Sequence, residues 1–125
     1  MKNTRMILPH DFILDMLYPL PTRTKKMFGV VSIYCGEKIL FATRQKEDNP
    51  VDNGIWIATK LEHHEELRAL IPELRNLETY KIKSWLLLHE EEPNFEERAS
   101  QLVDLFKAGS PLVGTIPKPK KKKQQ

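Results

Sequence analysis

A short apolar segment that turns back on itself at Gly36-Glu37 constrains the fold of this chain most. Residues 30–35 alternate in hydrophobicity with the period of two that marks a strand with one better-buried face. Gly36 can supply the positive φ that the first central position of a type II′ turn requires, and residues 39–44 return as a second strand. The sequence therefore predicts a β-hairpin and a sheet-containing core.

Two further segments have the composition of strands. Residues 54–59 follow a polar, turn-rich loop, and residues 83–89 have apolar side chains on both faces, which is typical of an interior strand. Because the first three strands have short links, they favour an antiparallel meander. The predicted fold class is α+β: a two-layer structure with an antiparallel β-sheet of about four to five strands, a meander near the N-terminal half, and three flanking helices.

Two of the helices are predicted in the first two thirds of the chain. The first covers about residues 9–18 and ends before prolines at positions 19 and 21. Residues 22–26 are polar and predict a solvated connection, although their three cations could contact phosphate. The second helix opens with Thr59 and Glu62, which have the spacing of a capping box.

The third helix has the strongest helical period in the sequence. Its capping signal is Asn94 followed by Glu97, and Gly109 is the predicted C-terminal cap. The apolar positions that share one face are Phe95, Ala99, Leu102, Val103 and Phe106. We expect this face to clamp the sheet, with Trp85 beneath it and Phe106 buried.

Length and composition indicate one globular domain, predicted to span residues 1–114. The 125 residues are 40% hydrophobic and 30% charged, and a chain of this size buries roughly two thirds of its unfolded surface. Its longest apolar runs are far shorter than the roughly 20 residues that cross a bilayer, and residues 1–9 lack an apolar stretch of signal-peptide length. Cys35 has no disulfide partner in the chain. These features predict a cytoplasmic protein without membrane contact.

The net charge of +3 is concentrated at the C-terminus. The cations there are Lys118, Lys120, Lys121, Lys122 and Lys123. Without these five, 15 basic residues remain against 17 acidic ones, so residues 1–114 carry about −2. Prolines 117 and 119 and mutual lysine repulsion predict that residues 115–125 form a disordered Pro/Lys-rich tail. This tail is a solubilising terminus or, alternatively, a polyanion contact for nucleic acid or anionic lipid.

Two kinds of residue invite a catalytic or metal-binding interpretation. Cys35 could be a reactive thiol, but it is predicted at the end of a strand with no base or cationic cluster beside it. His63 and His64 diverge by about 100° on a helix, so they cannot readily bind one metal ion together. Both observations favour structural or surface roles.

Carboxylates and tryptophans offer the remaining candidates. A divalent-cation site or an acid/base pair could be built from Glu90, Glu91, Glu92, Glu96 and Glu97. Two of these five fall in the first turn of a predicted helix, where the helix dipole favours anions without any catalytic role. Trp56 and Trp85 could stack a ligand, but their strand context favours core packing. We therefore predict no catalytic residue, no metal ligand, no cofactor and no enzyme activity.

Four short segments together carry a family resemblance. They are Lys26-Met27-Phe28-Gly29, Ile39-Leu40-Phe41, Lys83-Ser84-Trp85-Leu86-Leu87-Leu88 and Gly114-Thr115-Ile116-Pro117-Lys118. Over about residues 12–118 the chain resembles the TfoX N-terminal-like family, which is named after a bacterial regulator of natural competence. The family's Arg-Met-Phe-Gly-Gly pattern has Val30 in place of its second glycine here. The resemblance implies a compact α+β domain, similar to YjbR-like small domains, and no established catalytic residues.

These observations predict a non-enzymatic accessory or regulatory domain that acts by protein–protein interaction, with a protein partner or another copy of itself. The alternative is a weak nucleic-acid-associated regulatory factor that uses its Lys-rich tail, with Arg23, Lys25 and Lys26 as a second contact region. The charge of about −2 on residues 1–114 weighs against this alternative, because a dedicated nucleic-acid binder carries basic charge on its folded surface as well.

Overall fold

The computed structural model describes residues 8–27 and 29–117. Its strands are β1 (Arg23–Met27), β2 (Val30–Cys35), β3 (Lys38–Arg44), β4 (Gly54–Ile57), β5 (Arg75–Asn76) and β6 (Leu86–His89). Its helices are α1 (Phe12–Leu17), α2 (His64–Leu70) and α3 (Phe95–Lys107), with short 3₁₀ helices η1 (Pro50–Asp52) and η2 (Leu61–His63). No helix in this part of the chain is long and apolar enough to cross a membrane.

All six strands form one antiparallel sheet in the order β1-β2-β3-β4-β6-β5. The α+β class and the N-terminal meander are confirmed, with slightly more strands than predicted. The hairpin between β2 and β3 turns at Gly36, whose φ is +61°. Strand β6 lies between β4 and β5, as its two apolar faces predicted.

The connection predicted over residues 22–26 is wrong, because most of it is strand β1. Its residues pair with β2 in a continuous register, with Thr24 opposite Ile33. Arg23, Thr24, Lys25 and Lys26 are all exposed. The polar composition of β1 is compatible with a strand because β1 is at the edge of the sheet and is ordered by its pairing with β2. Charged side chains on an edge strand also discourage pairing with further chains.

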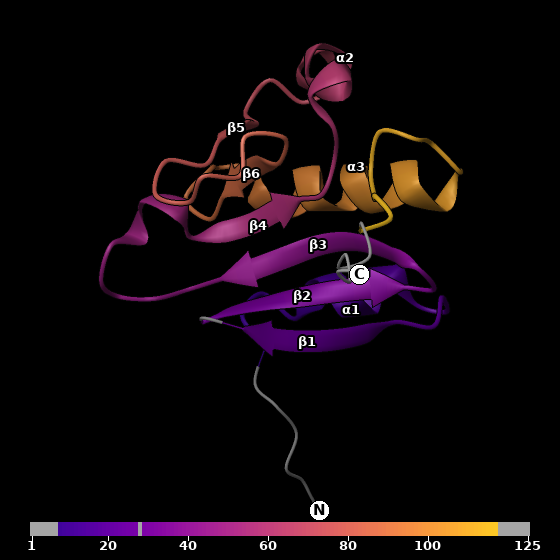
Figure 1. The fold of residues 1–125 in the computed structure, drawn as a ribbon, viewed down its shortest axis with the longest axis horizontal. Helices are drawn as coiled ribbons and strands as arrows, with labels where there is room; N and C mark the ends of the chain where they lie inside the picture. The colour runs from indigo at the N-terminus through magenta and orange to yellow at the C-terminus, as the bar shows by residue number, and fades with distance from the viewer. Residues whose placement is uncertain (1–7, 28, 118–125) are drawn as a thin grey trace, which may run out of the picture.

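The main core lies between the sheet and the helices. Helices α1 and α3 lie behind the strands in Figure 1. One row of the sheet on this side runs through Ile33, Phe41, Ile57 and Leu86, and all four side chains are fully buried. Burial of each such side chain stabilises the fold by about 1.5–3 kcal/mol, so this layer is the principal source of stability.

Helix α3 confirms the strongest helical prediction but corrects two of its contacts. The helix ends at Lys107, and Gly109 follows with φ +84°. Trp85 does not lie beneath it: this side chain belongs to a second apolar cluster with Trp56 and Leu87, on the face of the sheet that points away from α3. Phe106 is half-buried at the margin of the main core rather than enclosed by it.

Neither predicted capping signal makes a side-chain capping hydrogen bond in the described structure, although the predicted N-cap position of Asn94 is confirmed. Asn94 occupies the N-cap position of α3 but makes no side-chain cap hydrogen bond. After Thr59 the chain enters η2 first, and α2 begins at His64 without a side-chain cap. The Thr59 hydroxyl is buried without a hydrogen-bond partner in the described structure. Thr59 is buried just after β4 and therefore does not cap a helix, although its spacing to Glu62 had predicted that role.

The end of the described chain returns to the sheet. Thr115 pairs with Ile39, through hydrogen bonds of 2.8 and 3.0 Å between their backbone groups. Leu112 and Val113, just before it, are buried in the main core. Backbone pairing thus extends one residue beyond the boundary predicted at residue 114.

Candidate functional site

The face of the sheet that points away from the helices carries one continuous row of cross-strand partners. From β1 to β5 the row is Lys25, Ser32, Ala42, Trp56, Leu87 and Arg75. Directly opposite residues of antiparallel strands share a face and stand side by side. The row therefore places a lysine and an arginine at the two ends, and small side chains beside a large aromatic one in between.

A shallow apolar groove results from this size pattern. Its volume is about 170 Å³, and its lining residues are Val30, Ser32, Ala42, Trp56, Tyr80, Ile82 and Trp85. Ser32 and Ala42 leave the space, because neither side chain reaches far above the sheet. The segment after β5 supplies the opposite wall through Tyr80, Ile82 and Trp85, all of which are half-buried. Both tryptophans of the chain thus face one solvent-accessible hollow.

Arg44 supports the side of this groove that Tyr80 lines. Its side chain is only 4% exposed, and its Nε donates a 3.2 Å hydrogen bond to the Tyr80 hydroxyl. The guanidinium carbon lies 5.7 Å from the centre of the Tyr80 ring. The Tyr80 ring in turn meets Trp56 edge to face, with 4.6 Å between ring centroids. A buried cation therefore orients two of the aromatic side chains that line the groove.

Asp52, in the loop after β3, also supports the groove. It is fully buried, and its carboxylate accepts backbone hydrogen bonds from Glu78 (2.9 Å) and Thr79 (2.8 Å). Its backbone carbonyl accepts a 2.9 Å hydrogen bond from Trp56 Nε1. Asp52 thus positions both Trp56 and the segment that carries Tyr80.

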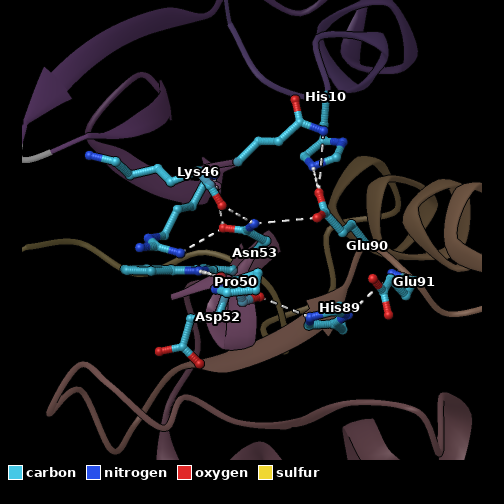
Figure 2. A network of polar contacts seen from close by, with 11 residues as sticks. His10, Lys46, Pro50, Asp52, Asn53, His89, Glu90 and Glu91 are labelled. Atoms are coloured by element: carbon cyan, nitrogen blue, oxygen red, sulfur yellow. Dashed lines mark hydrogen bonds and ion pairs between the residues drawn. The ribbon is translucent and has the colours of Figure 1, made fainter. Parts of the chain in front are cut away.

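Asn53 is the centre of the polar cluster shown in Figure 2. Its Oδ1 accepts from Arg44 Nη1 (2.6 Å) and from the backbone nitrogen of Lys46 (3.1 Å). Its Nδ2 donates to the Lys46 carbonyl (2.8 Å) and to Glu90 Oε2 (3.3 Å). Two acceptor bonds and two donor bonds use the full capacity of a side-chain amide. Asn53 therefore holds the loop after β3 in place and keeps no group free for a ligand.

His10 and Glu90 close the cluster at its outer end (Figure 2). His10 Nε2 donates to Glu90 Oε1 over 3.1 Å, and the two side chains are 11% and 19% exposed. The His10 ring also packs edge to face against Phe95, with 5.0 Å between centroids. Burial lowers the pKa of His10 below its ordinary value of 6.5, and the attraction of Glu90 offsets only part of this effect.

A polar hollow of about 470 Å³ lies beside this cluster, lined by Gln45, Lys46, Glu47, Pro50, Asn53 and Glu90. Asn53 and Glu90 are hydrogen-bonded to each other, and they also bond to His10, Gln45 and the Lys46 backbone. The remaining lining comes from exposed side chains of one loop. These hydrogen bonds stabilise the loop.

The structure separates most of the residues that the sequence singled out. Cys35 is a half-buried free thiol at the end of β2. Glu90 joins the Asn53 cluster, and it also lines a hollow of about 380 Å³ together with Glu96 and Glu97 from the first turn of α3. Among the residues described, no group of three or more His, Cys, Asp or Glu side chains is placed to bind a metal ion.

The histidine pair is also split, and the lysine tail is outside the structure. His63 ends η2, and His64, which begins α2, contacts the Ser84 carbonyl through Nε2 over 2.7 Å. Lys118, Lys120, Lys121, Lys122 and Lys123 lie outside the described residues. Trp56 is buried in the second apolar cluster, as expected, and the half-buried Trp85 packs against that cluster; both side chains also line the groove.

Sequence reasoning missed Arg44, Asp52 and Asn53 entirely. The loop from residue 45 to 54 was interpreted as turn-forming, although Asp52 and Asn53 are buried. Their roles depend on partners 26 to 37 residues away in the sequence, and no local pattern encodes those pairings.

Comparisons with protein-family models, with curated proteins and with solved structures return no match. The TfoX-like resemblance stays a prediction from sequence, and the function has to be argued from the groove and its surroundings.

Proposed function

We propose that this chain is a cytoplasmic, non-enzymatic accessory or regulatory domain that binds another protein through the groove on the open face of the sheet. The occupant is an acidic, extended segment of a partner protein that inserts one large apolar side chain between Trp56 and Trp85. The apolar groove between two tryptophans carries this proposal. Aromatic side chains in such pockets contribute a large share of the binding energy at protein interfaces.

Charge complementarity supports an acidic partner. The cross-strand row that forms the groove floor ends in Lys25 on one side and Arg75 on the other. Lys81 and Lys83 are exposed and alternate in sequence with the groove-lining Tyr80 and Ile82. Carboxylates on both sides of an apolar anchor would meet these cations, and complementary potentials favour both encounter and register.

The edge strand β1 argues for a foreign segment over a second copy. An extended segment can add to a sheet edge through backbone hydrogen bonds. If two copies of this chain paired through β1, Arg23, Lys25 and Lys26 would face like charges, which is destabilising. An acidic segment meets no such repulsion.

The rigid support of the groove also favours a binding role. Arg44 and Asp52 hold Tyr80, Trp56 and the backbone at residues 78 and 79 from within the protein. A pocket that keeps its shape without a ligand loses less conformational entropy on binding. Arg44 and Asp52 would therefore assist binding indirectly, because they hold the apolar side chains of the groove in place.

Selection from a displayed random-peptide library tests this proposal with a defined probe. We expect the selected peptides to contain Asp and Glu around a single aromatic or large aliphatic residue, and to change the tryptophan fluorescence on binding. Ser32→Glu places a negative charge at the groove and should weaken these peptides by about tenfold or more. Ser100→Glu, on α3, is the matched control and should leave the affinity unchanged.

Two results would overturn the proposal. Equal binding by the Ser32→Glu and Ser100→Glu variants would show that the peptides bind elsewhere. A dimer in light scattering that dissociates in Ser32→Glu would identify a second copy as the occupant instead of an acidic partner.

A further inference from the structure

A second hollow, separate from the groove, has a basic lining. Its volume is about 240 Å³, and it is lined by Lys38, Lys60 and His63 together with residues of the segment from Pro111 to Ile116. The lining contains no acidic side chain. Lys60 is exposed, and Lys38 and His63 are half-buried, so all three remain accessible to a dissolved ligand.

The strap formed by Gly114 and Thr115 brings these basic residues together. Thr115 pairs with Ile39, one residue after Lys38, while the Gly114 nitrogen donates a 2.7 Å hydrogen bond to the Ala58 carbonyl, two residues before Lys60. The strap therefore crosses between the start of β3 and the segment after β4. Residues that are 22 positions apart in the sequence converge on the same hollow.

The positive charge of the hollow is not balanced within the described structure. The ion pairs in the described part of the chain are His10–Glu90 and Arg98–Glu73, and neither pair includes a residue that lines the hollow. Lys38 Nζ lies 5.8 Å from the Phe106 ring centre, a contact that does not neutralise it. The acids adjacent in sequence, Glu37 and Glu62, are exposed and do not contribute to the lining.

We infer that this hollow binds a phosphate group of a polyanionic ligand. Lysine ammonium groups are compact point charges that bind phosphate oxygens, and the Thr115 side chain adds a hydroxyl to the lining. Lys118 follows Ile116 by only two positions in the sequence.

The basic hollow is separate from the protein-binding groove, and its local charge differs from the net charge of the domain. The charge of about −2 on residues 1–114 is a sum over the whole domain, and it does not describe the local charge at Lys38, Lys60 and His63. Lys38 and Lys60 place basic charge on the folded surface beside the segment from Pro111 to Ile116, which precedes the Lys-rich segment in the sequence.

Calorimetric titration with inorganic tripolyphosphate at low salt tests the site. The double variant Lys38→Gln/Lys60→Gln should bind about 5- to 30-fold more weakly than the parent, as expected for the loss of two partly exposed charge contacts. The matched control Lys46→Gln/Lys107→Gln removes the same net charge at two exposed lysines outside the hollow and should bind like the parent. Equal urea midpoints for the two variants would establish that both are folded.

A chain ending at Pro117 separates the hollow from the lysine tail. We expect it to keep tripolyphosphate binding that remains sensitive to Lys38→Gln/Lys60→Gln. The same measurements with a single-stranded oligothymidylate identify the source of the phosphates: sensitivity with both ligands indicates a nucleic-acid backbone, and sensitivity with tripolyphosphate alone indicates free polyphosphate. The inference is overturned if both double variants weaken binding equally, if the truncated chain does not bind, or if the parent binds neither ligand.

Discussion

Asn53 and Arg44 are joined by a 2.6 Å hydrogen bond between the amide oxygen and guanidinium Nη1, and both side chains are almost completely buried. The described structure contains no ion pair to Arg44; its other acceptors are the Asn49 carbonyl and the Tyr80 hydroxyl. Neutral oxygens therefore stabilise a buried positive charge, and this makes Asn53 a critical partner.

Replacement of Asn53 by Ala should lower the free energy of unfolding by about 3 kcal/mol, because it leaves a buried guanidinium and two backbone groups of Lys46 with fewer partners. Urea unfolding measures this loss. Thr79→Ala is the control: its hydroxyl accepts only an exposed hydrogen bond from Asn49, and the change should remain within about 0.5 kcal/mol. Similar midpoints for the two variants would contradict a central role for Asn53.

Gly54 should tolerate substitution far less well than Gly36. A Cβ at Gly54, where φ is +141°, would collide with the Leu88 carbonyl oxygen and approach the Glu90 nitrogen to 2.9 Å. At Gly36 a Cβ would meet nothing within 4 Å, so only the positive φ of +61° opposes it. We expect Gly36→Ala to cost about 1–2 kcal/mol and Gly54→Ala clearly more. Thermal melts showing comparable losses would mean that β4 and β6 do not approach as closely as described.

The His10–Glu90 contact predicts a pH dependence of stability. Because burial lowers the pKa of His10 below 6.5, the folded state binds fewer protons than the unfolded state just below pH 6.5. The stability that depends on neutral His10 is therefore present above pH 6.5, and it is lost as the pH falls through the pKa that His10 has in the folded state.

His10→Asn tests this dependence, since Asn accepts the positive φ of +55° at this position and its side chain does not titrate. Urea midpoints measured from about pH 8 down to about pH 5 should fall more steeply for the parent than for His10→Asn. Parallel curves would show that His10 does not contribute to the acid sensitivity.

Phe41 and Phe106 provide a matched pair for the core. Phe41 is fully buried in β3, so Phe41→Ala should cost about 3–5 kcal/mol through lost transfer free energy and a residual cavity. Phe106 is half-buried at the core margin, and Phe106→Ala should cost roughly half as much. Denaturant titrations that rank the two variants in the opposite order would show that α3 packs more deeply than the structure places it.

The sequence by itself determined the parts of the fold that depend on local patterns. Alternation over residues 30–35, the turn at Gly36 and the helical period from Phe95 to Phe106 predicted the hairpin and the last helix. The two apolar faces of the residue 83–89 segment predicted an interior strand, which β6 confirms. Each of these signals acts within a few residues, where backbone periodicity alone decides which side chains share a face.

Only the tertiary structure decided where the surface sites lie. Strand β1 could not be predicted from its polar composition, because this edge strand forms through backbone pairing with β2 and not through burial of its own side chains. The groove depends on the register that aligns Ser32, Ala42 and Trp56 on three strands. The basic hollow likewise depends on the Thr115 strap, which joins segments far apart in sequence. These pairings depend on packing between segments that are far apart in the sequence, so the pattern of neighbouring residues does not predict them.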